Sequence, residues 1–324
     1  MPAKRSVEDQ LAALEELREG SPEAALEPLR KLLAHRNNYV VAKAADLVAR
    51  FRLTALVPEL GAAFDRFFTN PVETDPQCWA KNSLARTLAA LEYQDDAIFL
   101  RGMRHIQFEP VWGGRSDTAG GLRATCALAL VQCRTLPEAD LLAYLIELLG
   151  DKDKTVRGEV ARAIEQVGSP SAALLLRLRA VLGSDEPEVM GACYSGVLSI
   201  EGVTAIPWVA RFLEAADDSA AEAALAIAST RSPEAFEALR ARLLDKSDPW
   251  FRSVVLSAIA LTRQEAALEF LLELVRKKSP DAEAAAEAIM RSMPSPERLK
   301  QLEELASDYP RLTRVLQKNR AKQP

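Results

Sequence analysis

Residues 156–167 read VRGEVARAIEQV, and the same pattern returns as FRSVVLSAIALT in 251–262 and as AEAAAEAIMRSM in 282–293. In each segment the apolar side chains recur every three or four residues, which is the period of a helix with one buried face. Eight residues along the chain occupy the same register position: Val40, Ala80, Leu122, Val156, Val189, Ser219, Phe251 and Ala282. The intervals of 30 to 42 residues between neighbours indicate a repeat of two helices.

The starts of the predicted helices also recur. A serine followed by proline, a combination that caps and opens a first helical turn, stands at Ser21, Ser169, Ser232 and Ser295. We predict the first helices of the repeats at about 22–34, 54–68, 94–107, 137–149, 170–182, 202–213, 232–244 and 264–276. The second helices are predicted at about 38–51, 77–91, 118–133, 153–167, 186–199, 217–229, 248–261 and 280–291. Two further helices, about 295–306 and 308–318, complete the array.

Each helical pair in such an array buries its apolar stripe against the neighbouring pairs. We therefore predict an all-α fold without strands, a right-handed α–α superhelix (a solenoid) of about eight helical hairpins with capping helices at both ends. A single domain is expected to cover residues 1–324. Its predicted parts are an N-terminal capping helix (1–20), irregular repeats with long loops (21–133), regular repeats (134–291), and C-terminal capping helices with a basic tail (292–324).

Charge and cysteine content narrow the class of protein. The chain has 41 Lys and Arg against 46 Asp and Glu, a net charge of −5, which disfavours binding to nucleic acid mainly through phosphates. Its four cysteines show no CxxC spacing and are predicted to be buried free thiols, as in a reducing compartment. The sequence after Met1 has no apolar signal segment, and we find no run of 18 apolar residues. We expect a cytoplasmic protein that does not contact a membrane.

We find no catalytic, metal-binding or cofactor-binding motif in the sequence. The two histidines, His35 and His105, have no cysteine or carboxylate at the spacing of a zinc site. Glu73 and Asp75 lie two apart but have no predicted partner that would make them a general acid and base. The chain contains no phosphate loop, dinucleotide fingerprint or nucleophile elbow. We therefore expect no metal, no cofactor, no catalytic residue and no enzymatic activity.

The segment 151–168, DKDKTVRGEVARAIEQVG, resembles the HEAT repeat, in particular the short bacterial form of the phycobilisome lyases. The segment 245–261 resembles it as well, and the resemblance is strongest over 136–291. It implies a scaffold, in a family that spans protein-binding adaptors, chromophore lyases and DNA-repair proteins.

The same resemblance implies a ladder of ion pairs between neighbouring repeats. An Asp in the turn within a repeat commonly pairs with an Arg near the start of the second helix. The matching residues are Asp151 or Asp153 with Arg157, and Asp248 with Arg252. The ladder is predicted to be interrupted where the Arg is replaced, at Met190, Ala220 and Glu283.

Two repeats carry insertions between their helices, at residues 69–76 and 108–117. Because both lie at the same place in a repeat, stacking is expected to bring them side by side. Trp112 is followed by two glycines that allow positive φ, and Arg115 offers a fork of donors for a carboxylate or phosphate. The predicted site comprises Trp79, Arg86, Trp112, Gly113, Gly114, Arg115, Asp117 and Arg162.

Several residues of this predicted site have a structural alternative. Asp117 is positioned to cap the following helix. Trp112 could instead pack down as a plug, with Arg115 paired to Glu109 or Asp117. Cations gather on the second helices of these repeats, and in this family's geometry Arg86 and Arg162 point into the concave groove. The alternative for these cations is ladder pairing and solvated charge. They are Lys81, Arg86, Arg123, Arg157 and Arg162.

The sequence favours an interaction scaffold that binds a protein or peptide through its concave face and the two insertions, because Trp and Arg dominate interface energies. One alternative is a nucleic-acid-binding protein that resembles the DNA glycosylases built on HEAT-like repeats. Another is a chromophore lyase subunit. No residue is identified as a bilin-binding thiol, and Cys78 beside Trp79 is a weak candidate.

Overall fold

The computed structural model describes residues 7–244, 248–292, 295–307 and 309–320, so the end of the predicted basic tail lies outside the described residues. The chain divides into two compact units, Met1–Val167 and Gly168–Pro324. Unit one contains α1 (Val7–Arg18), α2 (Pro22–Leu33), α3 (Asn38–Phe51), η1 (Thr54–Leu56), α4 (Val57–Arg66), α5 (Pro71–Thr74), η2 (Pro76–Cys78), α6 (Trp79–Ala90), α7 (Asp96–Met103), β1 (Phe108–Val111), β2 (Gly114–Asp117), α8 (Gly120–Leu130), α9 (Glu138–Leu149) and α10 (Lys154–Val167).

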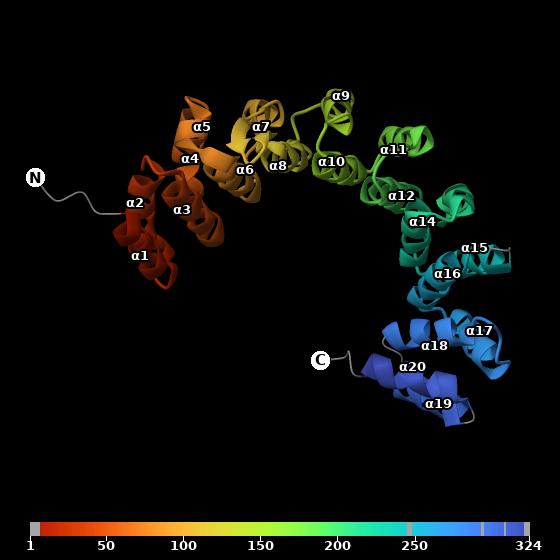
Figure 1. Ribbon diagram of the computed structural model, residues 1–324. Coiled ribbons are helices and arrows are strands. Elements are labelled where there is room, and N and C mark those ends of the chain that lie inside the picture. The colour runs from red at the N-terminus through yellow and green to blue at the C-terminus, as the bar shows by residue number, and fades with distance from the viewer. Residues whose placement is uncertain (1–6, 245–247, 293–294, 308, 321–324) are drawn as a thin grey trace, which may run out of the picture. The chain divides into compact units, whose positions relative to one another are not determined.

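Unit one is built in two layers. The second helices α3, α6, α8 and α10 pack against one another in sequence order, and each first helix packs on its own second helix. Figure 1 shows α4, α7 and α9 in one row and α6, α8 and α10 in the other. The core between the layers consists of the apolar register residues and their helical neighbours, such as Val40, Leu84 and Leu122, all buried. The predicted helical stack is therefore confirmed in this unit.

Local capping explains where several helices begin. Ser21 Oγ accepts a hydrogen bond from Ala24 N at 3.3 Å, and proline occupies the first turn of α2. Asn37 caps α3 through a bond from Val40 N at 3.1 Å. These bonds satisfy main-chain donors that a helix leaves unpaired at its first turn.

Unit two continues the same two-helix pattern. It contains α11 (Pro170–Leu182), α12 (Pro187–Glu201), η3 (Gly202–Ala205), α13 (Ile206–Ala210), η4 (Arg211–Ala215), α14 (Asp218–Ser229), α15 (Pro233–Leu244), α16 (Pro249–Leu261), α17 (Glu265–Arg276), α18 (Ala282–Arg291), α19 (Pro296–Ser307) and α20 (Pro310–Arg320). The second helices α12, α14, α16 and α18 stack in order, and α20 packs on α18. The predicted helix 202–213 is divided into η3, α13 and η4, where Gly202 has a φ of 69° and Pro207 opens α13.

One segment of unit two combines length and apolar composition. By length and composition alone, Pro187–Ala215 is long and apolar enough to cross a membrane, yet 61% of its most apolar window is buried in the structure. The segment is divided among α12 and the three short helices that follow it. Such burial is what the core helix of a globular protein also shows.

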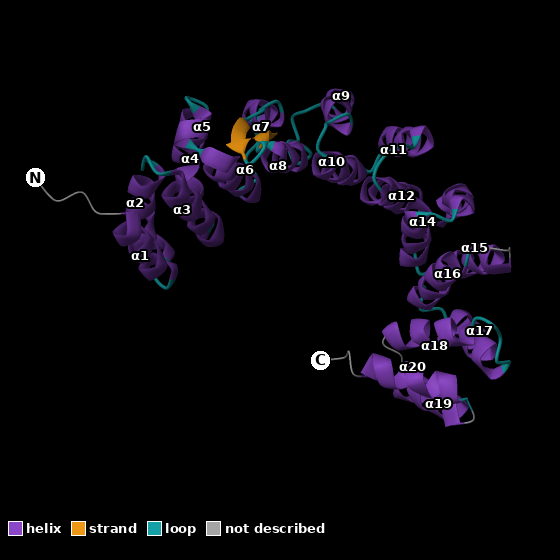
Figure 2. Cartoon of the chain, in the orientation of Figure 1, coloured by secondary structure: helices purple, strands orange, loops and turns teal. Residues whose placement is uncertain are grey.

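The prediction of a fold without strands is wrong at the second insertion. Phe108–Val111 pairs antiparallel with Gly114–Asp117, with Val111 opposite Gly114, so Trp112 and Gly113 form a two-residue turn (Figure 2). Gly113 has a φ of 89°, which a glycine adopts without steric cost. The remaining described elements are helices, as expected for an all-α solenoid.

The first insertion forms a tight helical connection. It contains α5 and η2 before α6 begins at Trp79, two residues later than predicted. Gln77 and Cys78 have φ values of 59° and 55°, a left-handed conformation that costs roughly 1–2 kcal/mol per residue for non-glycine residues. Surrounding contacts must therefore hold this segment in place.

Candidate functional site

A buried ion pair holds the first insertion. Lys81 Nζ lies 3.0 Å from Asp75 Oδ2, and both side chains are completely buried. The Asp75 carboxylate also accepts hydrogen bonds from Ala80 N at 2.8 Å and from Asn38 Nδ2 at 3.0 Å. Lys81 Nζ donates to Phe67 O at 3.2 Å. Asp75 therefore caps α6 and joins the insertion to both α3 and α6.

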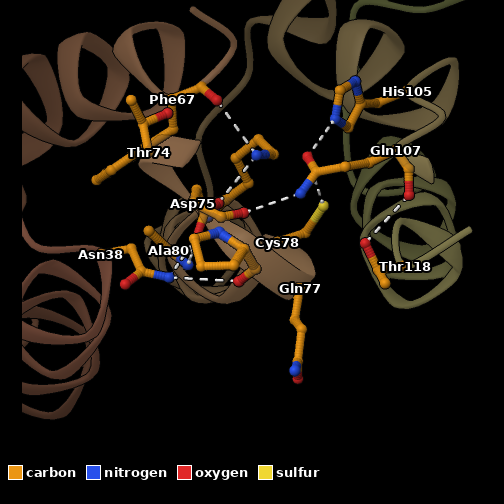
Figure 3. A network of polar contacts seen from close by, with 12 residues as sticks. Asn38, Phe67, Thr74, Asp75, Gln77, Cys78, Ala80, His105, Gln107 and Thr118 are labelled. Carbon is orange, nitrogen blue, oxygen red and sulfur yellow. Dashed lines mark hydrogen bonds and ion pairs between the residues drawn. The ribbon is translucent and has the colours of Figure 1, made fainter. Parts of the chain in front are cut away.

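Gln107 connects this ion pair to the base of the hairpin. Its Nε2 donates to Asp75 O at 2.9 Å and to Glu109 Oε1 at 2.6 Å. Its Oε1 accepts from Cys78 Sγ at 3.3 Å and lies 3.0 Å from His105 Nε2. Figure 3 shows the Gln107 amide between His105 and Cys78, directed toward Asp75. The two insertions are thus side by side and share one polar network, as their repeat positions predicted.

Glu109 is the buried carboxylate of the hairpin. Its Oε1 accepts hydrogen bonds from Gln77 N at 2.6 Å and from Thr118 Oγ1 at 2.7 Å. Burial raises the pKa of Glu109, but the hydrogen bonds from Thr118, Gln107 and the Gln77 amide outweigh this effect and lower the pKa below its usual range. Glu109 is therefore ionised near neutral pH, and it holds the left-handed Gln77 main chain.

Arg123 fastens the other end of the hairpin. It donates from Nε to Asp151 Oδ2 and from Nη1 to Asp117 Oδ2, both at 2.7 Å, and from Nη1 to His105 O at 3.0 Å. Burial lowers the pKa of Arg123, but the hydrogen bonds that it donates to Asp151 and Asp117 outweigh this effect and raise the pKa. Asp117 Oδ1 accepts from Ala119 N at 3.0 Å, which confirms that it supports the start of α8. Asp117, one of the predicted site residues, belongs to the framework that holds the hairpin.

Trp112 lies at the tip of this hairpin, and its side chain is fully exposed. The alternative that Trp112 plugs the loop is therefore wrong. Arg115 Nη2 donates to Phe108 O at 3.0 Å and pairs with neither predicted carboxylate, because Glu109 and Asp117 are used inside the framework. A Cβ atom added to Gly113 or to its neighbour Gly114 would meet nothing within 4 Å. The hairpin tip is thus open to solvent.

The remaining predicted residues lie on second helices. Trp79, at the start of α6, is 49% exposed, and its ring centroid is 5.5 Å from that of Tyr39. Arg86 lies on the same helix, with Nη2 3.1 Å from Ser83 Oγ. Arg162 lies on α10 and pairs with Glu159 of its own helix. The structure therefore places Trp79 and Arg86 on one helix, whereas Arg162 belongs to another.

Carboxylates or carbonyls accompany the predicted cations. Lys81 and Arg123 are buried in the network, Arg86 is 3.9 Å from Asp46, and Arg157 Nη1 donates to the carbonyls of Asp151 and Lys152. Ladder pairing and solvation describe these cations better than a continuous phosphate-binding surface does.

The ion-pair ladder exists with partners other than those predicted. The Asp151 carboxylate binds Arg123 of the preceding repeat, not Arg157. Arg252 Nε donates to Asp281 Oδ1 at 3.0 Å, and its Nη2 donates to Oδ2. The carboxylate of Asp248 accepts from Trp250 N at 2.9 Å and so caps α16. In both described pairs, an Arg binds an Asp in the turn of the following repeat.

Sequence reasoning missed most of the buried network. One signal was present, because Lys81 follows register residue Ala80 just as Arg123 follows Leu122. Lys81 thus occupies the ladder position of its repeat. Nothing local marked Gln107, because its role depends on an insertion about thirty residues away.

A comparison with protein families agrees with this architecture. A family model described as HEAT repeats matches residues 115–191 and 207–290. A comparison with curated proteins gave no match. Among solved structures, the chain is similar to human deoxyhypusine hydroxylase in complex with glycerol, with 17% sequence identity and a TM-score of 0.31, over 81% of this chain and 92% of that chain.

Proposed function

This chain belongs to the HEAT-repeat family, and we propose that it is a non-enzymatic scaffold that binds a protein or peptide partner through the concave face of its second helices and the 69–76 and 108–117 insertions. The phycobilisome-lyase subtype stays a prediction. So does a cytoplasmic location, which is favoured by four free and buried cysteines.

The observation that supports this proposal is the exposed Trp112 at the tip of a hairpin whose base is held by hydrogen bonds and ion pairs. A fully exposed tryptophan leaves a large apolar surface in water, and tryptophan is the residue type most enriched at the energetic centres of interfaces. The base of the hairpin is held by Glu109 and by the Arg123–Asp117 pair. A partner would therefore meet an already ordered loop, which reduces the entropy lost on binding.

The other two functions receive less support. A nucleic-acid-binding surface needs cations free for phosphates, whereas Lys81 and Arg123 are buried with carboxylates. A lyase thiol needs access and a thiolate, whereas Cys78 is buried and burial raises its pKa to about 12.

The test is a comparison of partner binding by two tryptophan variants. We expect Trp112→Ala to weaken the affinity of a co-purified partner by about 30-fold to 1000-fold, which corresponds to about 2–4 kcal/mol for an interface anchor. Trp250→Ala is the matched control, because Trp250 is 46% exposed at the start of α16 in a regular repeat. A titration of the purified partner measures both. Equal affinity of wild type and Trp112→Ala, or an equal loss with Trp250→Ala, contradicts the proposal.

A further inference from the structure

A hollow of about 500 Å³ lies at the carboxyl ends of the second helices α6 and α8. This volume falls within the range of about 300–1,000 Å³ that is usual for ligand-binding clefts. Its lining combines a small apolar floor with a charged rim, and comprises Arg52, Arg86, Ala89, Ala90, Glu92, Thr125, Leu128, Ala129 and Gln132.

The rim has an excess of positive charge. Glu92 lies 3.9 Å from Arg52 and 3.5 Å from Arg134, and Arg86 lies 3.9 Å from Asp46. With Arg134 and Asp46, which contact the lining residues Glu92 and Arg86, three guanidinium groups accompany two carboxylates, on a chain whose net charge is −5. Each of the three arginine side chains is more than 60% exposed. These ionic contacts exceed hydrogen-bond length, so the arginines retain donors for a closer, bidentate carboxylate.

Backbone geometry directs Arg52 and Glu92 to this edge. They follow α3 and α6, with left-handed φ values of 51° and 57°. A guanidinium at a helix carboxyl end is favoured by the helix dipole, which stabilises Arg52 at this edge. Glu92 contacts its two arginines only at 3.9 Å and 3.5 Å, so a ligand carboxylate that makes shorter, bidentate hydrogen bonds can compete with it.

Aromatic side chains lie at the opposite end of the same helices. Trp79 opens α6 and contacts Tyr39, which lies near the start of α3. From Trp79 to Ala90 the helix rises about 16 Å, which an extended peptide covers in about five residues. Between the two ends, α6 presents Asn82 and Arg86. We call this surface of α6, with Tyr39 and the hollow, the α6 strip.

We propose that the α6 strip binds a short acidic peptide segment in extended conformation. An apolar side chain of the segment packs on Tyr39 and Trp79, and a carboxylate about five residues later binds Arg52 and Arg86. The proposal rests on the proposed function, because it names the chemistry of the partner for the same second-helix face. The carboxylate can belong to an acidic side chain or to a chain terminus, since both offer the same two oxygens.

The experiment uses a synthetic nine-residue peptide with one tryptophan near its amino end, two glutamates five residues later and an amidated terminus. Its binding to the full chain is measured by fluorescence anisotropy at low salt. We expect a dissociation constant on the order of 10–100 μM, and at least tenfold weaker binding when lysines replace the two glutamates. A third peptide, with glutamines in place of the glutamates and a free terminus, separates a terminal carboxylate from a side-chain carboxylate.

Variants of the chain locate the binding site. Arg52→Glu and Arg86→Glu should each weaken binding of the glutamate peptide at least tenfold, because each replaces an attraction with a repulsion. Glu92→Gln should tighten binding about twofold to fivefold, because it removes the competing carboxylate. The matched control is Arg263→Glu, since Arg263 follows α16 with a φ of 55°, as Arg52 follows α3. It should leave binding unchanged, and circular dichroism should show that every variant is folded.

Three results overturn the proposal: equal binding of the glutamate and lysine peptides, unchanged binding by both arginine variants, or an equal loss with Arg263→Glu. If one of these occurs while a partner still depends on Trp112, the proposed function stands and the acidic-peptide inference alone fails. If instead peptide binding depends on Arg52 and Arg86 but no partner depends on Trp112, the role of the hairpin fails and the α6 strip stands.

Discussion

The helices α6 in unit one and α16 in unit two hold equivalent places in their repeats but use their charged residues differently. Each begins with a half-exposed tryptophan, Trp79 or Trp250, and each carries a cation directly after its register residue. In α16 this cation, Arg252, binds Asp281 of the next repeat. In α6 it is Lys81, which binds Asp75 of its own repeat's insertion.

This difference shows how one ladder position serves two purposes. In the regular repeat the ion pair joins successive hairpins and remains partly exposed to solvent. In the insertion-bearing repeat the pair is completely buried, and Asp75 also caps α6. The buried pair orders a connection with left-handed main chain at Gln77 and Cys78, which supports the hairpin above it.

The largest expected effect comes from removing the buried carboxylate. Asp75→Ala leaves Lys81 buried without its counter-charge, and we expect a loss of about 3–5 kcal/mol in the free energy of unfolding. Asp281→Ala leaves Arg252 in contact with solvent, and we expect a smaller loss of about 1–2 kcal/mol. Urea denaturation followed by circular dichroism measures both losses.

Asp65→Ala serves as the control for these two variants, because Asp65 forms an exposed pair with Arg101. It should change the free energy of unfolding by less than about 1 kcal/mol. If Asp75→Ala and Asp281→Ala lower the free energy of unfolding equally, the buried ion pair of α6 contributes no more than the partly exposed pair of α16. The proposed difference between the two repeats is then wrong.

An intermediate effect is expected in the pH dependence of stability. The folded-state pKa of Glu109 is lowered, so its contribution is present above its unfolded pKa near 4.3 and is lost as the pH falls through the folded value. Glu109→Gln should therefore reduce the loss of stability between about pH 5 and pH 3. In unit two, burial beside Glu188 raises the pKa of Glu222, so its contribution is present below its unfolded pKa and is lost as pH rises.

Glu222→Gln should therefore change the pH dependence of stability in the opposite direction to Glu109→Gln. It should stabilise the chain at pH 7 and change its stability little at pH 3. Urea midpoints measured across this pH range test the pair of variants. Parallel pH profiles for wild type and Glu109→Gln would show that the hairpin base does not depend on the Glu109 charge.

The smallest expected effect on stability belongs to the exposed tryptophan of the hairpin. Trp112→Ala should change the free energy of unfolding by less than about 0.5 kcal/mol, because its side chain packs on nothing that folding buries. Trp79→Ala should cost more, since half of Trp79 is buried and its ring contacts Tyr39. Thermal unfolding compares the two. A large loss of stability with Trp112→Ala would show that the hairpin tip supports the fold.

The β1–β2 hairpin is a part of the fold that the sequence analysis did not predict. A strand signal needs alternation over several residues, and each strand here has four, with Pro110 in the first. The two glycines after Trp112 were predicted to allow positive φ, and Gly113 adopts a φ of 89° in the turn between the strands. The pairing on either side depends on Glu109 and Asp117 being held by groups from the framework, including Gln77 and Arg123.

The candidate site also contains residues that the sequence analysis identified and a residue whose role it missed. Trp112 and Arg115 stood out because tryptophan and arginine in a long glycine-containing loop are unusual, and both lie on the exposed hairpin. Asp117 stood out as a cap and is also a ligand of Arg123. Asp75 was noted only as an unpartnered loop carboxylate, although it is the centre of the buried network.

The sequence by itself determined the repeat, the order of the helices and the location of both insertions, because helical periodicity and capping act between residues a few positions apart. Only the tertiary structure decided which carboxylate meets which cation, and that Trp112 stays in solvent. Asp151 meets Arg123 across 28 residues, and Gln107 meets Asp75 across 32. Such contacts depend on how one repeat stacks on the next, and no local pattern encodes that distance.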